Sequence, residues 1–138
     1  MTDLSTVAVG TELPALQVTF DRQRLVRYAG ASGDFNPIHY SDHHARALGL
    51  AGCLAHGMLT MGVGLRVVTD WCVDPGRVRR YSVRFTKPVQ VPDDDAGAVV
   101  HFTARVSAIE DAVATVAIDA RCGEDKVLGA AVAEVSLA

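Results

Sequence analysis

The sequence predicts a single α+β domain, residues 1–138, in which an antiparallel sheet wraps around a buried central helix. A long apolar segment at residues 48–68 has the composition of a helix enclosed by protein, and after Pro75 the hydrophobic pattern changes to the period of two that is typical of strands. A helix that is apolar on most of its circumference needs cover, which a curled sheet supplies. A chain of 138 residues is long enough for one such core but not for two.

The composition indicates which classes of partner to expect and in which cellular compartment the protein works. Hydrophobic residues make up 49% and charged residues 21%, so disorder is not expected, and a net charge of −3 gives no general attraction to nucleic acid or to anionic membranes. The three cysteines are odd in number and form no CxxC motif, which favours a reducing compartment over a disulfide framework. The N-terminus lacks the basic start and apolar run of a signal peptide, so we expect a cytoplasmic protein.

Two short helices are expected before the apolar segment. The first begins after Asp21, a good N-cap, with Phe20 packing on Leu25 as a hydrophobic staple, and it ends near Gly30. The second occupies residues 41–49, between an N-cap serine and a glycine stop. Both helices are therefore bounded by residues that favour helix ends.

The apolar segment 48–68 is also compatible with a membrane span. However, His56 lies near its middle and Arg66 near its end, and five glycines interrupt it. A central histidine followed by an arginine is costly in lipid, so a helix surrounded by protein is the better interpretation. We expect this helix from His56 to about Cys72, closed by the turn at Pro75-Gly76.

Five strands are expected, one before the helices and four after them. They lie at residues 15–20, 79–86, 98–107, 112–121 and 126–137. The last is apolar on both faces, which is typical of a strand with neighbours on both sides. Turns are expected at residues 93–97 and 123–125. A strand, then helices, then consecutive antiparallel strands around one apolar helix make a hot-dog fold the natural candidate.

An acid and an imidazole lie close together on a stiff segment between the first two helices. Pro37 fixes its own φ and forces Asn36 toward an extended conformation, so Asp34 and His39 are held on a rigid loop. Such a pair can bind a water and exchange protons near neutral pH. Alternatively, Asp34 and Asn36 are turn-forming residues that bond their own backbone. The spacing alone leaves both interpretations open.

Three motifs occur in order along the chain. They are YAGASGDFNPIHYS at residues 28–41, AHGMLT at 55–60 and VRFTKPV at 83–89. Together they resemble the signature blocks of the MaoC-like, or hydratase-2, family of the hot-dog superfamily. Within that family, the length and texture are most similar to the catalytic B-type subunit of the (3R)-hydroxyacyl-carrier-protein dehydratase of mycolic-acid and type II fatty-acid synthesis.

This resemblance implies reversible hydration of trans-2-enoyl thioesters, or dehydration of (3R)-3-hydroxyacyl thioesters. Asp34 and His39 match the catalytic pair that would hold the water and exchange protons with the substrate. Gly57, at the expected start of the buried helix, would bind the thioester oxygen through its backbone N–H. Asn36 is expected to orient the Asp34 loop, and Thr60 to support the site where relatives often carry serine.

The resemblance also implies no cofactor, since coenzyme A or the phosphopantetheine of an acyl carrier protein (ACP) carries the substrate. Asp42, His43 and His44 with His39 look like a metal cluster. Adjacent histidines on a helix point in different directions, however, and hot-dog hydratases use no metal, so no metal site is expected. We expect His56 to be a structural histidine at the helix start and not a third catalytic group.

Two features bear on the carrier of the substrate. A basic cluster either contacts the carrier protein or the phosphates of coenzyme A, or is the solvated face of a strand. It consists of Arg77, Arg79, Arg80, Arg84 and Lys87. In addition, residues 89–94 read VQVPDD where many relatives carry Pro-Gly-Asp after the Pro-Val pair. This departure puts carrier and chain-length preference in doubt and leaves the expected catalytic pair intact.

We expect a homodimer, or a heterodimer with a second hot-dog subunit, joined sheet edge to sheet edge. Neither nucleic acid nor a membrane span is expected. A chain of this fold can also serve as a hot-dog thioesterase, or as a non-catalytic subunit that shapes the acyl tunnel of a partner. The intact Asp34, Asn36 and His39 block argues against both. The sequence leaves open whether this chain is catalytic only when it is paired with such a non-catalytic subunit.

Overall fold

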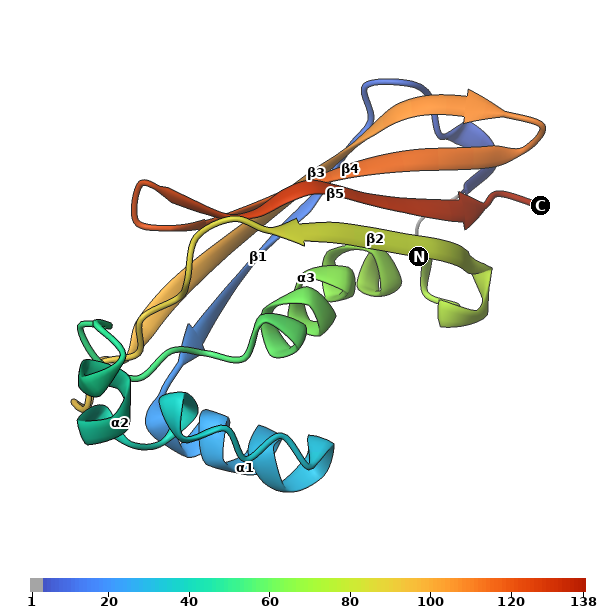
Figure 1. Ribbon diagram of the computed structural model, residues 1–138. Coiled ribbons are helices and arrows are strands. Elements are labelled where there is room, and N and C mark those ends of the chain that lie inside the picture. Colours follow the sequence, from blue (N-terminus) through green and yellow to red (C-terminus); the bar gives the residue numbers. More distant parts are fainter. Residues whose placement is uncertain (1–3) are drawn as a thin grey trace.

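The computed structural model describes residues 4–138 as one five-stranded antiparallel sheet packed on a long helix (Figure 1). The strands are β1 (Glu12–Phe20), β2 (Val78–Phe85), β3 (Ala98–Glu110), β4 (Val113–Cys122) and β5 (Asp125–Ser136). The helices are α1 (Arg22–Ser32), α2 (Asp42–Ala47) and α3 (Gly57–Cys72), with 3-10 turns η1 (Leu4–Thr6), η2 (Pro37–His39) and η3 (Pro75–Arg77). The five predicted strands and three predicted helices are therefore confirmed.

The sheet has the strand order β1-β3-β4-β5-β2, so β1 and β2 are its edges. β5 lies between β4 and β2, as its apolar pattern on both faces predicted. The expected turns also form: Asp94 Oδ1 accepts hydrogen bonds from the backbone N–H groups of Ala96 and Gly97, at 3.0 and 2.7 Å. Gly123, with φ +59°, makes the turn from β4 to β5.

α3 runs along one face of the sheet and contacts all five strands, while α1 and α2 lie near the end of the sheet where β1 ends (Figure 1). Gly64 allows the close approach of α3, because a Cβ there would lie 3.2 Å from both the Phe102 ring and the Tyr81 hydroxyl oxygen. Tyr81 donates a hydrogen bond to the Met61 carbonyl at 3.0 Å, and burial raises its pKa to about 12. Side chains of the sheet therefore contact the backbone of α3 directly.

Cover around α3 is less complete than its composition predicted. Every fourth residue along one stripe is exposed: Met58, Gly62, Arg66 and Asp70. The sheet covers only the opposite side, and the polar end of the stripe is an exposed Arg66–Asp70 ion pair of 3.5 Å. None of the helices described in residues 4–138 is long and apolar enough to cross a membrane.

The helix ends follow the capping residues, with one correction. Asp21 Oδ1 accepts a hydrogen bond from Arg24 N at 2.7 Å, and Phe20 and Leu25 are both fully buried, as a hydrophobic staple requires. The prediction that α1 ends near Gly30 was wrong by a few residues. The helix continues to Ser32 and ends at Gly33, whose φ of +76° is the left-handed conformation that stops a helix.

Candidate active site

The segment after α1 is built from a series of local hydrogen bonds. Asp34 N donates to Ser32 Oγ at 3.1 Å, and Asn36 N donates to Asp34 Oδ1 at 3.2 Å. Asn36 Oδ1 accepts from Ile38 N at 3.2 Å and so caps η2, in which Pro37 is the first residue. Asp34 and Asn36 are therefore turn-forming residues, as one interpretation of the sequence had it. This role does not prevent Asp34 from also pairing with His39, the other interpretation.

His39 lies close to Asp34 with a defined proton arrangement. The Leu54 carbonyl can only accept, so His39 Nδ1, 2.8 Å away, carries the proton in the neutral ring. The lone pair then lies on Nε2, which is 3.8 Å from Asp34 Oδ2. This separation is too long for a direct hydrogen bond but allows one water oxygen to lie at about 2.8 Å from both atoms.

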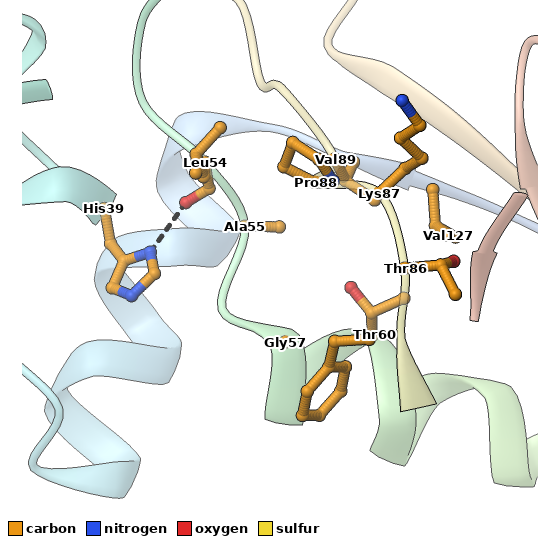
Figure 2. A pocket seen from close by; sticks show the side chains of 11 residues that line it. His39, Leu54, Ala55, Gly57, Thr60, Thr86, Lys87, Pro88, Val89 and Val127 are labelled. Carbon is orange, nitrogen blue, oxygen red and sulfur yellow. Dashed lines mark hydrogen bonds between the residues drawn. The ribbon is translucent and has the colours of Figure 1, made fainter. Parts of the chain in front are cut away.

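Beside this pair is a cavity of about 330 Å³, shown in Figure 2. His39 lies at one end, held by its bond to Leu54, and Lys87 lies on the loop after β2. Of the five site residues expected from the sequence, His39, Gly57 and Thr60 line the cavity. Asp34 and Asn36 lie on the loop that precedes His39 and do not line the cavity. Asp34 is next to the cavity only through its neighbour His39, whose Nε2 is 3.8 Å from Asp34 Oδ2.

Gly57 is the first residue of α3. The first four N–H groups of a helix have no acceptor within it, so this N–H is available at the cavity wall. A Cβ on Gly57 would lie 3.1 Å from the Phe85 ring, so any other residue at this position would press on that ring. Thr60, one turn later, is buried, and its hydroxyl lies 3.5 Å from the His56 carbonyl oxygen. The helix start thus offers a free donor in a mostly apolar wall.

His56 lies at the start of α3, as expected, but its contacts were not foreseen from the sequence. Its ring stacks on His39 with centroids 3.7 Å apart and planes 22° apart, and Tyr28 contacts it edge-on at 4.7 Å. Its Nε2 donates to the Asp34 carbonyl at 3.2 Å. Burial, followed by the neighbouring His39, lowers the pKa of His56, so the ring is kept neutral. The two stacked histidines are seventeen positions apart in the sequence, and nothing in that spacing signals contact.

The geometry is unfavourable for a metal ion at either histidine cluster. Donor atoms of Asp34, His39 and His56 lie within 4.8 Å of one another. An imidazole lone pair lies in the ring plane, and two rings stacked nearly parallel direct their lone pairs to different points. A shared ion would require one ring to leave the stack. In the other cluster, Asp42 is already bound to Arg22 at 2.9 Å and accepts from Cys53 N.

The basic cluster is partly structural. Arg77 donates to the carbonyls of Ser136 and Ala138, at 3.3 and 2.7 Å, and Arg79 donates to the Ser136 hydroxyl at 3.1 Å. These two arginines therefore hold the C-terminal end of β5. Lys87, in contrast, is exposed and lines the cavity.

Comparison with known proteins gives a consistent result. A family model described as a MaoC like domain matches residues 5–121. The 3-hydroxyacyl-thioester dehydratase X of Mycobacterium tuberculosis is 38% identical over 79 residues, which are 57% of this chain but only 27% of that protein. The matched segment therefore covers only about a quarter of the length of this relative.

Two solved structures share the fold over nearly the whole chain. A MaoC-like dehydratase is 36% identical with a TM-score of 0.94, covering 99% of this chain and 42% of the other. The ChsH1–ChsH2 complex from Mycobacterium tuberculosis contains a chain that is 28% identical, with a TM-score of 0.80 and coverage of 94% and 97%. Both structures therefore share the fold of this chain over at least 94% of its length.

Proposed function

Since the chain belongs to the MaoC-like dehydratase family, we propose that it catalyses the reversible hydration of trans-2-enoyl thioesters, or the reverse dehydration of (3R)-3-hydroxyacyl thioesters. The observation that carries this proposal is that His39, which lines the cavity, lies beside the Asp34 carboxylate and shares that cavity with Gly57. A histidine lone pair faces a carboxylate 3.8 Å away, and the free N–H of a helix start lies on the same cavity wall.

Hydration adds the water oxygen to C3 of the substrate and a proton to C2. In our proposal, the water lies between His39 Nε2 and Asp34 Oδ2 and passes one proton to this pair as its oxygen bonds to C3. The pair returns a proton to C2, so the enzyme ends in its starting state. We assign no separate acid and base, because two interacting groups titrate as a unit.

As water adds, negative charge develops on the thioester oxygen. The Gly57 N–H is placed to bind this oxygen, with the dipole of α3 adding to the stabilisation. In acyl-transfer enzymes, removing one such donor costs roughly 100- to 1,000-fold in rate. Asn36 and Thr60 have supporting roles: Asn36 fixes the loop that carries Asp34, and Thr60 packs beneath the helix start.

The chemistry proposed here needs no cofactor, and the acyl chain would be carried on coenzyme A or on the phosphopantetheine of ACP. Lys87 on the cavity wall is suited to a phosphate of either carrier. The three cysteines are all free thiols, which is consistent with a cytoplasmic, reducing compartment.

We also infer that the working form is a dimer with a second hot-dog domain. β2 is an edge strand that ends at Phe85, which is 55% exposed, and the start of α3, which lies against Phe85 at Gly57, carries Met58, which is 58% exposed. An unpaired edge with apolar neighbours favours pairing with another sheet. The complexed relative and the MaoC-like dehydratase more than twice as long as this chain support a second domain, identical or not.

The test is an absorbance assay of conjugated enoyl thioesters. The purified chain, alone and with a candidate hot-dog partner, is incubated with short and long trans-2-enoyl-CoA and with enoyl-ACP. We expect the absorbance to fall as water adds and the (3R)-hydroxy product to form. Absence of hydration with every thioester, alone and with the partner, would reject the function. Release of free thiol instead would indicate the thioesterase.

A further inference from the structure

We propose that His56 is a positioning residue that holds both members of the Asp34–His39 pair, an inference that rests on the function proposed above. It contacts His39 through its ring and Asp34 through its Nε2. Neither the hydration chemistry nor the cavity wall requires this residue directly. Its place beneath both reacting groups is the feature to be explained.

The contact with Asp34 fixes the backbone of the acid. His56 Nε2 donates to the Asp34 carbonyl at 3.2 Å, across a sequence separation of 22 residues. The Asp34 carboxylate itself is half exposed, at 51%, so side-chain packing alone does not hold it. The hydrogen bond ties the loop that carries this exposed acid to the start of α3, close to Gly57.

The contact with His39 fixes the plane of the imidazole. Stacking at 3.7 Å prevents the His39 ring from tilting, while the bond from Nδ1 to the Leu54 carbonyl sets its rotation. When His39 carries an extra proton during the reaction, a neutral aromatic ring beneath it is a favourable neighbour. A second cation there would be repulsive, so the role requires His56 to stay neutral.

The environment of His56 enforces that neutrality. The ring is 1% exposed, and its Nδ1 has no hydrogen-bond partner within residues 4–138. Protonation would bury an N–H without an acceptor, which costs free energy. The titratable groups facing His56 are Tyr28, His39 and Asp34, and burial lowers the pKa of His56 despite the nearby carboxylate.

Two variants separate the two contacts. His56→Gln places an amide nitrogen near the position of Nε2, so it keeps a donor for Asp34 and removes the ring. His56→Phe keeps a ring for His39 and removes the donor. His101→Gln is the matched control, because His101 is exposed on β3. We expect kcat for hydration to fall roughly 10- to 100-fold in both His56 variants, with KM within about threefold of wild type and the control unchanged.

A kcat within about threefold of wild type in either His56 variant would overturn the proposal. If the variants do not fold, spectra of the wild-type protein still test the proposed role of His56. In ¹⁵N spectra at pH 7, His56 is expected to be a neutral Nε2–H tautomer, with contacts between the two rings. A protonated ring or an Nδ1–H tautomer at neutral pH would contradict it. If the wild type hydrates no thioester, the proposed function fails, and the spectra alone decide the position of His56.

Discussion

Gly57 lies directly against the ring of Phe85, so that an added Cβ would come within 3.1 Å of two ring carbons. This relationship joins the start of α3 to the end of β2. Glycine, a residue of low helix propensity, lets the ring lie this close to the helix start, at the wall of the cavity.

Gly57→Ala is therefore expected to lower kcat/KM for hydration by about tenfold or more, because the methyl group obstructs approach of the thioester oxygen to the N–H. The effect on folding should be small, since Phe85 is 55% exposed and its ring can shift. Steady-state kinetics and a thermal melt measure both quantities. Unchanged kinetics in the folded variant would contradict the assigned role of the Gly57 N–H.

Two further glycines of α3 are expected to respond to alanine with opposite signs. Gly62 has open space around a Cβ, so Gly62→Ala should stabilise the protein by about 0.5–1 kcal/mol. At Gly64 a Cβ would meet Phe102 and Tyr81 at 3.2 Å, so Gly64→Ala should destabilise it by about 1–3 kcal/mol. Urea unfolding gives both values, and equal signs would contradict the packing of α3 on the sheet.

Asp42 predicts a specific pH dependence of stability. Hydrogen bonds from the Cys53 N–H and from Arg22 hold the pKa of Asp42 below its ordinary value of 3.8. A lowered carboxyl pKa stabilises the fold above the ordinary pKa, and this contribution is lost as pH falls through the folded-state pKa. Wild type should therefore be more stable than Asp42→Asn at pH 7, and the difference should shrink as pH falls below the ordinary value of 3.8 toward the lower folded-state pKa. A constant difference across this range would argue against the ion pair.

The dimer surface can be tested at Met58. Met58→Glu puts a charge on an exposed apolar residue in the first turn of α3, whose first residue lies against Phe85 at the end of the β2 edge strand. An acid in the first turn of a helix does not harm the helix itself. Light scattering should show a shift toward monomer. Leu48→Glu is the control, because Leu48 is more exposed, at 72%, and lies after α2, away from that edge. An unchanged Met58→Glu dimer would place the interface elsewhere.

Local patterns predicted most of the fold. The caps at Asp21 and Ser41 and the period of two after Pro75 are determined by neighbouring residues, and each gives the observed element. The pairing of β2 with β5 was not predictable in this way, because it depends on the path of the chain between distant segments. For the same reason, the exposed stripe on α3 was missed.

The candidate site, like the fold, has some features that neighbouring residues determine and others that depend on distant segments. Asp34 and His39 share one short segment, so their proximity could be inferred from the rigid turn at Pro37. The Leu54 carbonyl that orients His39 has no side-chain signature, and the stack with His56 forms only when α3 docks. Contacts made by backbone atoms or across distant segments are the ones that sequence patterns leave undetermined.

The most direct test of the account is hydration of trans-2-enoyl thioester by Asp34→Asn, beside wild type and Asp95→Asn, in whichever state of assembly the wild type is active. Asp95 is an exposed aspartate of the loop before β3 and serves as the matched control. We expect Asp34→Asn to lose at least about 100-fold in kcat while remaining folded, and Asp95→Asn to match wild type. Asp34→Asn with wild-type kcat would contradict the central claim that Asp34 and His39 together activate the water.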